Sequence, residues 1–246
     1  MTDKHIIFGL HAVEAVMAKY PERILRLAVL EDRQDKKLHA LLEAAKAKKI
    51  KVELLSRHAL DKLTHEANHQ GAVAYCDKPK LYTEKDLAAL LDGLSEPAFL
   101  LILDGVQDPH NLGACLRTAD AAGVHAVLAP KDKSVGLTPT VSKVACGAAE
   151  SVPFIQVTNL ARTLRELKDR NIWVFGAAGE AETSLYAAKL TGAIAVVLGA
   201  EGAGLRRLTR EHCDVLLSIP MAGSVSSLNV SVATGVFLFE AVRQRG

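Results

Sequence analysis

The sequence lacks the features that mark secreted and membrane-spanning proteins. Its four cysteines are far apart and form no CxxC pair, so we expect neither a disulfide framework nor a zinc ribbon, and a reducing compartment fits. The longest apolar runs, Phe99–Leu103 and Ala193–Ala200, are much shorter than the about 20 residues that span a bilayer. No apolar segment with a small-residue cleavage site opens the chain, so no signal peptide is expected. These absences predict a cytoplasmic protein without a membrane partner.

Aromatic residues and an excess of one charge are also lacking. Only 4% of the 246 residues are aromatic, which predicts an aliphatic core. The 30 Lys and Arg residues against 28 Asp and Glu give a net charge of +2, so affinity for nucleic acid would have to come from local patches. Residues 1–75 carry a net +3 and six of the nine histidines. This fits either contact with a polyanion or an ordinary solvated face.

Several catalytic motifs are missing as well. There is no GxxxxGK[ST] phosphate loop, no GxGxxG after a strand and no GxSxG nucleophile elbow. The segment His65-Glu66-Ala67-Asn68-His69 matches HExxH, which on a helix could bind zinc with the glutamate as base. However, it runs directly into the apolar stretch Ala72–Cys76 and no third ligand is apparent. We therefore expect no metal, and a polar loop whose histidines could face RNA.

Apolar periodicity predicts two α/β regions. Residues 1–75 form a compact unit, residues 76–97 read as a linker with a weak helix at Glu84–Leu91, and residues 98–246 alternate strands and helices as in a parallel sheet covered on both faces. The predicted strands are Ile24–Leu30, Ile50–Leu55, Ala72–Cys76, Phe99–Leu103, Ala126–Ala129, Phe154–Val157, Ile172–Gly176, Ala193–Leu198 and Leu216–Ile219. The other predicted helices are Ala12–Lys19, Asp35–Lys48, Arg57–Leu63, Leu112–Ala122, Leu160–Asp169 and Leu228–Arg243.

The first chemically informative segment follows the strand Phe99–Leu103. A helix is expected to begin near Asn111, which either caps that helix or faces a ligand at the carboxyl end of the strand. Arg117 is flanked by apolar residues and therefore needs an anionic partner. That partner is either a substrate or a salt bridge to Asp120 or Asp104.

Two later segments have the same position relative to a strand. In the run GAEGAG, three glycines surround Glu201, so the loop either grips a polar ligand such as adenosine or is a turn in which Glu201 caps a helix. In the run IPMAGSVSSLNVS, a small-residue loop precedes an almost wholly apolar helix, which must be buried under the sheet or against another subunit. Ser227 and Asn229 either cap this helix or contact a substrate.

Taken in this order, the three segments resemble the motifs of the knotted SPOUT-class methyltransferases of the TrmH type. These enzymes methylate ribose 2′-oxygens in RNA with S-adenosyl-L-methionine. The runs DPHNLGACLRTADAAGVHA, VACGAAESVPF, GAEGAGLRRLTREHCD and IPMAGSVSSLNVSVATGVFLFEAVRQR are similar to those of the branch that methylates a guanosine in the peptidyl-site loop of 23S rRNA. The resemblance implies an L30e-like RNA-binding domain at residues 1–75, a SPOUT domain with a C-terminal trefoil knot at 98–246, and a homodimer.

The resemblance also implies residue roles. The catalytic residues would be Asn111, Arg117, Glu201, Ser227 and Asn229. The cofactor would lie against Leu198, Gly199, Ala200, Ile219, Met221 and Leu228. The proton acceptor stays open, because a guanidinium holds its proton tightly. Either Arg117 acts as a base when paired with a phosphate, or it clamps the phosphate while Glu201 or water takes the proton.

Two other functions fit the residues less well. The first keeps the chemistry and changes the substrate to a tRNA or another rRNA loop. The second is a non-catalytic RNA-binding module, against which the intact motif residues argue. Binding of S-adenosyl-L-methionine would separate an enzyme from such a module.

Overall fold

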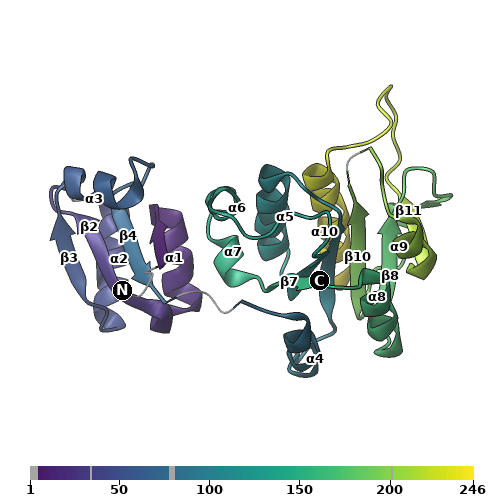
Figure 1. Ribbon diagram of the computed structural model, residues 1–246, viewed down its shortest axis with the longest axis horizontal. Helices are drawn as coiled ribbons and strands as arrows, with labels where there is room; N and C mark the ends of the chain where they lie inside the picture. Colours follow the sequence, from purple (N-terminus) through teal and green to yellow (C-terminus); the bar gives the residue numbers. More distant parts are fainter. Residues whose placement is uncertain (1–4, 34, 78–80, 201) are drawn as a thin grey trace. The chain divides into compact units, whose positions relative to one another are not determined.

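The structure is a computed structural model that describes residues 5–33, 35–77, 81–200 and 202–246. The chain folds into two compact units (Figure 1). The first comprises Met1–Lys80 with Cys146–Ser151, and the second comprises Leu81–Ala145 with Val152–Gly246. Among the described residues, no helix has the length and apolar character needed to cross a membrane.

In the part of the first unit that the structure describes, four strands form one sheet in the order β1-β4-β2-β3. Strands β2 and β3 are parallel, and the other pairs are antiparallel. The elements are β1 (His5–Phe8), α1 (Leu10–Lys19), β2 (Ile24–Leu30), α2 (Lys36–Ala47), β3 (Val52–Leu55), α3 (Arg57–Thr64), β4 (Ala72–Cys76) and α7 (Ala148–Ser151), with a 3-10 turn at Pro21–Arg23.

Alternation along the strands gives this sheet two buried faces. Leu27 and Val29 of β2 pack with apolar residues of α1 and α2, whereas Ala28, between them, packs with Leu60 of α3. Helix α2 begins after Asp35, whose carboxylate accepts hydrogen bonds from two backbone N–H groups of the first turn. The sheet is therefore covered by helices on both sides.

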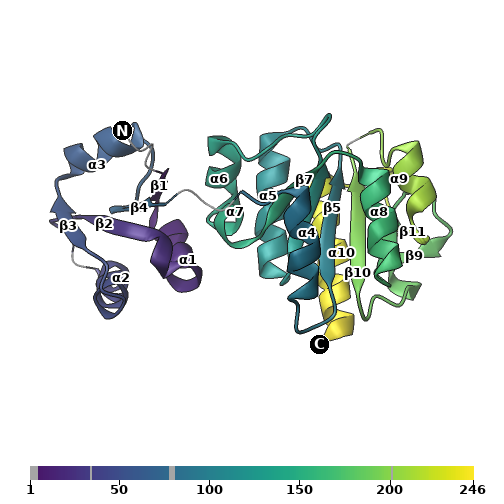
Figure 2. The same cartoon turned by 60° about the horizontal axis from the view of Figure 1, so that its bottom comes forward.

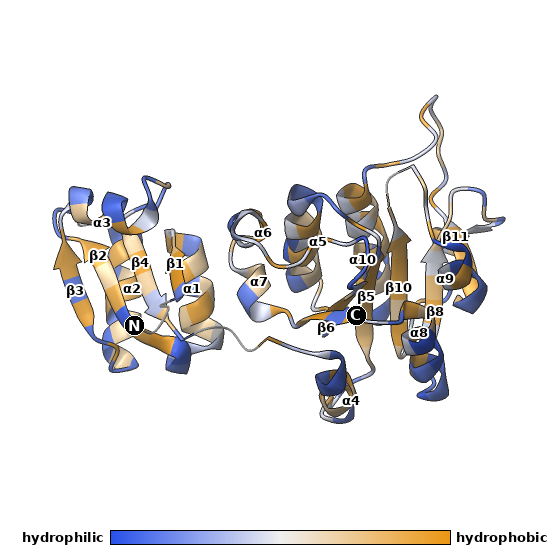
Figure 3. Ribbon diagram, in the orientation of Figure 1, coloured by the Kyte–Doolittle hydropathy of each residue, from blue (hydrophilic) through white to orange (hydrophobic). Residues whose placement is uncertain are grey.

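The second unit contains a seven-stranded sheet in its described part, in the order β7-β6-β5-β10-β8-β11-β9, and every pair in it is parallel. The central strands β5 and β10 are buried along nearly their whole length, and they appear as apolar arrows in Figure 3. The strands are β5 (Phe99–Asp104), β6 (Ala126–Pro130), β7 (Phe154–Val157), β8 (Trp173–Ala177), β9 (Thr183–Ser184), β10 (Ile194–Gly199) and β11 (Val215–Ser218).

Helices cover both faces of the second sheet (Figure 2). Apolar residues of α4 and α8 pack on one face, and α5 and α10 pack against each other on the opposite face. The helices of this unit are α4 (Glu84–Asp92), α5 (Pro109–Ala121), α6 (Pro139–Ala145), α8 (Leu160–Asp169), α9 (Arg207–His212) and α10 (Val230–Arg245), with a 3-10 turn at Leu185–Ala187.

The predicted linker contains an element of the second unit. Leu87 of α4 is buried in the same apolar cluster as Leu100, Ile155 and Leu164, so residues 84–92 contribute to the core. In addition, Cys146–Ser151 groups with the first unit although the chain around it belongs to the second. The division into residues 1–75, 76–97 and 98–246 stays a prediction.

Candidate active site

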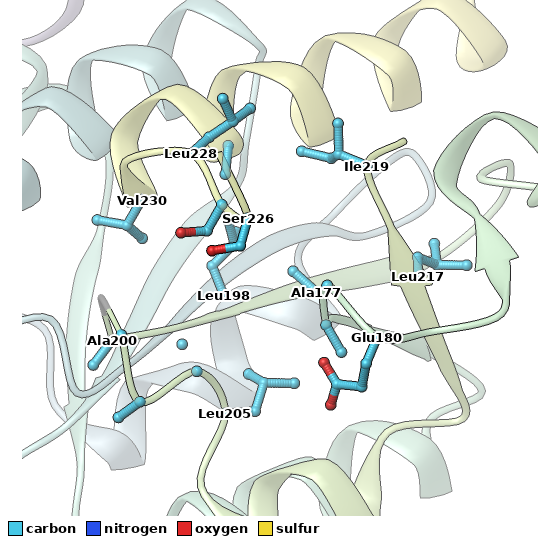
Figure 4. A pocket seen from close by; sticks show the side chains of 18 of the residues that line it. Ala177, Glu180, Leu198, Ala200, Leu205, Leu217, Ile219, Ser226, Leu228 and Val230 are labelled. Carbon is cyan, nitrogen blue, oxygen red and sulfur yellow. The ribbon is translucent and has the colours of Figure 1, made fainter. Parts of the chain in front are cut away.

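Three loops of the second unit surround one cavity of about 600 Å³ (Figure 4). They follow β10, β8 and β11, which are neighbours in the sheet. Because these strands are parallel, their carboxyl ends meet at one edge, where open α/β sheets build their binding sites. The segment just before α10 adds Ser226, Ser227, Leu228 and Asn229 to the lining.

The residues predicted to hold a cofactor come together here. All six line the cavity, namely Leu198, Gly199, Ala200, Ile219, Met221 and Leu228. Leu205 and Leu217 add apolar surface to the same walls. The walls therefore combine aliphatic side chains with backbone N–H and C=O groups at strand ends, which suits a flat, partly polar ligand.

The glycine-rich loop after β10 folds back on itself. The backbone N–H of Gly204 donates to the carbonyl oxygen of Ala200 over 2.9 Å. A Cβ on Gly199 would lie 2.1 Å from the carbonyl carbon and oxygen of Gly204, so no side chain fits there. Gly202 and Gly204 have φ values of +74° and +65°, which only glycine adopts readily. Glu201, the predicted acid of this loop, lies outside the described residues.

A buried carboxylate fixes the end of this loop. The Asp104 side chain, fully buried at the end of β5, accepts a hydrogen bond from the backbone N–H of Arg206 over 2.9 Å. The Arg206 guanidinium Nε lies 3.4 Å from the other carboxylate oxygen. Asp104 was expected as a possible partner of Arg117. That expectation was wrong, because Asp104 pairs with Arg206.

The first and third motifs meet through two asparagines. The side-chain amide of Asn229 donates to the Asn111 side-chain oxygen over 3.0 Å. Asn229 also caps α10, since its side-chain oxygen accepts from the backbone N–H of Ser231 over 2.9 Å. The suggestion that Asn111 caps α5 was wrong. Asp108 is the cap, accepting from the backbone N–H groups of His110 and Asn111, and Pro109 opens the helix.

Arg117 is separate from the cavity wall. Its side chain is exposed on α5, and it is not among the described residues that line the cavity. The buried side of α5 instead contacts α10, where the Cys115 thiol lies 3.3 Å from the Thr234 hydroxyl oxygen. The structure therefore brings Asn111, Ser227 and Asn229 to the cavity region, whereas Arg117 is exposed on α5 and is not among the described lining residues.

Sequence reasoning missed a charged pair at the cavity. Glu180, in the loop after β8, lines the cavity together with Arg210 of α9, and the Arg210 guanidinium donates to the Glu180 carboxylate. This hydrogen bond, with one from its own backbone N–H, holds the pKa of Glu180 below its usual 4.5. The only signal in the sequence was an acidic residue three positions after a buried strand.

The HExxH match falls in a loop of the first unit. Helix α3 ends at Thr64, and His65 and Glu66 have left-handed φ values. His69 is buried with both ring nitrogens engaged, one with the Asp61 carboxylate at 2.9 Å and one with the Gly71 backbone N–H at 3.0 Å. Within the described ranges, no group of three or more potential metal-binding side chains occurs.

Known proteins resemble both units. Residues 98–239 match the model of the SpoU rRNA Methylase family, and residues 6–82 match that of RNA 2'-O ribose methyltransferase substrate binding. The 23S rRNA (guanosine-2'-O-)-methyltransferase RlmB of Pectobacterium atrosepticum is 61% identical over 241 residues, covering 98% of each chain.

Solved structures share the fold. A crystal structure titled RNA 2'-O ribose methyltransferase is 28% identical, has a TM-score of 0.77 and covers 98% of this chain and 88% of that one. AviRb from Streptomyces viridochromogenes, described as a complex with AdoMet, is 23% identical with a TM-score of 0.75 and covers 98% and 90%. From the matches to both units and the full-length identity, the chain belongs to the SpoU rRNA methylase family.

Proposed function

We propose that this chain methylates the ribose 2′-oxygen of a guanosine in 23S rRNA, with S-adenosyl-L-methionine as methyl donor. The observation that carries the proposal is that the loops of the second and third motifs line one cavity, and that Asn229 at this cavity is hydrogen-bonded to Asn111 of the first motif. The full-length relative that is 61% identical bears the name of this activity. A transfer to tRNA has no comparable support, since no feature of the cavity favours it.

The cavity fits the proposed cofactor in size and chemistry. When bound, S-adenosyl-L-methionine supplies a methyl group on a positively charged sulfur. The side chains of Ile219 and Met221 offer apolar surface for an adenine. Leu198 and Leu228 line other parts of the cavity, and the backbone of the same loops offers hydrogen bonds. The charged side chains among the described lining residues are Glu180 and Arg210, which pair with each other, so the lining has no excess of positive charge.

Three side chains would handle the RNA ribose. Asn111 and Asn229 hold each other and would orient the sugar at the mouth of the cavity, with Ser227 beside them. Alignment of reactants contributes about 7–11 kcal/mol in favourable systems. Asn229 therefore matters for the reaction as well as for the start of α10, which it caps.

Arg117 would act on the RNA from outside the cavity. An exposed guanidinium on α5 suits a bidentate contact with a phosphate next to the target ribose. The 2′-oxygen would lose its proton either to Arg117 in that paired state or to Glu201 or water.

We also propose a cytoplasmic homodimer whose C-terminal segment forms a trefoil knot. Val232 and Phe239, seven residues apart on α10, are 52% and 49% exposed and form an apolar stripe suited to a second copy. The knot is proposed from the family resemblance alone. The first unit would be an L30e-like domain that binds the rRNA.

The test is mass spectrometry of rRNA and tRNA from a strain that lacks this protein. We expect the loss of one guanosine 2′-O-methyl group in 23S rRNA, restored by the intact gene and not by a variant with Asn111→Ala and Asn229→Ala. Loss of a methyl group from tRNA, with 23S rRNA unchanged, would contradict the proposed substrate.

A further inference from the structure

We infer that Glu180 recognises the ribose diol of the cofactor, with Arg210 as the positioning residue that holds its carboxylate; the inference rests on the proposed function. None of the three motif segments contains Glu180, and only its position in the lining of the cavity indicates a role.

Glu180 has the exposure and charge that a ligand contact requires. Its side chain is 64% exposed at the cavity, so it does not serve the core. Figure 4 shows its carboxylate beside Ala177 and Leu205, on the inner side of the loop after β8. The Arg210 hydrogen bond is the main cause that lowers its pKa below the usual 4.5, and the carboxylate is therefore ionised at neutral pH.

The carboxylate has capacity for a ligand. An ionised carboxylate offers about four acceptor sites. Arg210 and the Glu180 backbone N–H are the contacts that lower its pKa by hydrogen bonding. About two acceptor sites remain, and two adjacent hydroxyl groups are a matching pair of donors. A carboxylate at the end of a parallel strand also binds a ribose in dinucleotide sites of other α/β proteins.

The order of the strands selects the part of the cofactor that Glu180 meets. The loop after β8 lies between those after β10 and β11. The loop after β11 offers Ile219 and Met221 as an adenine wall, while Asn229 and its partner Asn111 mark the side where the methyl group must be delivered. The ribose connects adenine to the sulfonium, so the middle loop faces the ribose. An alternative is that Glu180 binds the cofactor's amino group.

The experiment is a binding cycle with three probes on the full-length protein. Isothermal titration calorimetry would measure the affinity of the protein for three compounds: S-adenosylhomocysteine, 5′-methylthioadenosine, and the 2′,3′-dideoxy form of 5′-methylthioadenosine. The affinity of weak ligands would be measured by competition against S-adenosylhomocysteine. The second probe lacks the amino acid, and the third also lacks the diol. The proteins are the wild type, Glu180→Gln, Glu180→Ala and the control Glu182→Gln, whose exposed carboxylate is two residues further along the same loop and outside the cavity lining.

We expect removal of the diol to weaken binding to the wild type and Glu182→Gln by about tenfold or more, as for loss of hydrogen bonds to a charged group. Glu180→Gln and Glu180→Ala should bind the two methylthioadenosines equally. If Glu180 had only a structural role, its variants would still bind 5′-methylthioadenosine more tightly than the dideoxy form, by the same factor as the wild type.

Other outcomes overturn the inference in distinguishable ways. If the Glu180 variants lose as much affinity as the wild type when the diol is removed, the inference is refuted. Weakened binding of S-adenosylhomocysteine with unchanged binding of 5′-methylthioadenosine refutes it in favour of the amino group. Failure of the wild type to bind S-adenosylhomocysteine refutes the proposed function as well.

Discussion

At the scale of single residues, substitution of Arg117 tests methyl transfer separately from cofactor binding. It is exposed on α5 and is not part of the described cavity lining. We therefore expect Arg117→Ala to lower methyl transfer by about a hundredfold or more while cofactor affinity stays nearly unchanged. Arg117→Lys should fail too, because an ammonium cannot reproduce the planar, bidentate contact of a guanidinium.

The measurements are methyl transfer to an rRNA fragment and calorimetry with S-adenosylhomocysteine. Arg165→Ala is the matched control, because Arg165 is an exposed arginine on α8, on the opposite face of the sheet. Near-normal turnover of Arg117→Ala would remove Arg117 from the reaction.

Gly199 tests whether the folded-back loop after β10 is required for binding. In Gly199→Ala the new methyl group would overlap the Gly204 carbonyl, at 2.1 Å. The loop must then open, at a cost of about 1–3 kcal/mol. We expect a lower Tm and loss of S-adenosylhomocysteine binding in calorimetry. Gly223→Ala, where an added Cβ meets no atom within 4 Å, should behave as wild type. Unimpaired binding by Gly199→Ala would show that the loop tolerates opening.

At the scale of elements, periodicity predicted most of the fold. The strands β2, β4 and β7 and the helix α8 have the predicted bounds, because continuous or alternating apolar residues define each. Short elements such as β1, β9, α6 and α9 were missed. The two residues of β9 and the one to two turns of α6 and α9 carry little periodicity. The start of α5 was misplaced because Asp108-Pro109, an N-cap followed by proline at the first helical position, was overlooked.

The site was less predictable than the fold. Its six predicted cofactor residues do meet at one cavity, because each follows a recognisable strand or opens a helix. Glu180 and Arg210 meet there only because β8 lies between β10 and β11. Similarly, Asp104 reaches Arg206 because β5 pairs with β10 in register. Strand order depends on packing of the whole sheet, which local sequence does not encode.

The end of α10 has a pH-dependent anchor. The Glu240 carboxylate accepts hydrogen bonds from Arg243 and Gln244, which lower its pKa from 4.5 to about 2. Gln244 in turn accepts from the backbone N–H of Leu190 and donates to the carbonyl of Ala188. The last turns of α10 are thereby tied to the segment that precedes β10.

We expect Glu240→Gln to lower the Tm by a few degrees at pH 7. A pKa that is lower in the folded state stabilises the protein above pH 4.5, and this stabilisation disappears as the pH falls towards about 2. The difference in Tm between wild type and variant should therefore narrow below pH 4.5, as measured by thermal unfolding across pH. Glu211→Gln, which breaks an exposed ion pair with Arg207, should have little effect at any pH. A pH-independent difference for Glu240→Gln would contradict this account.

At the scale of the whole molecule, the apolar stripe of α10 bears on whether the protein is a monomer or a dimer. Val232, Val236 and Phe239 recur at i, i+4 and i+7, so they share one helix face. Phe239 is 49% exposed and Val232 52%, although the opposite face of α10 packs against the sheet. Burial of such side chains against a second copy would contribute about 1.5–3 kcal/mol for each phenylalanine or valine that becomes fully covered.

We accordingly expect the wild type to be a dimer and Phe239→Glu to be a monomer, as measured by light scattering after gel filtration. The charge would have to be buried twice in a symmetric dimer, because the same patch faces itself. Leu208→Glu is the matched control, since Leu208 on α9 is also 49% exposed and should leave the dimer intact. If the active site is completed across this interface, the Phe239→Glu monomer will keep its fold and lose methyl transfer. A monomeric wild type would show that there is no dimer. A Phe239→Glu variant that remains a dimer would show that the interface lies on another surface.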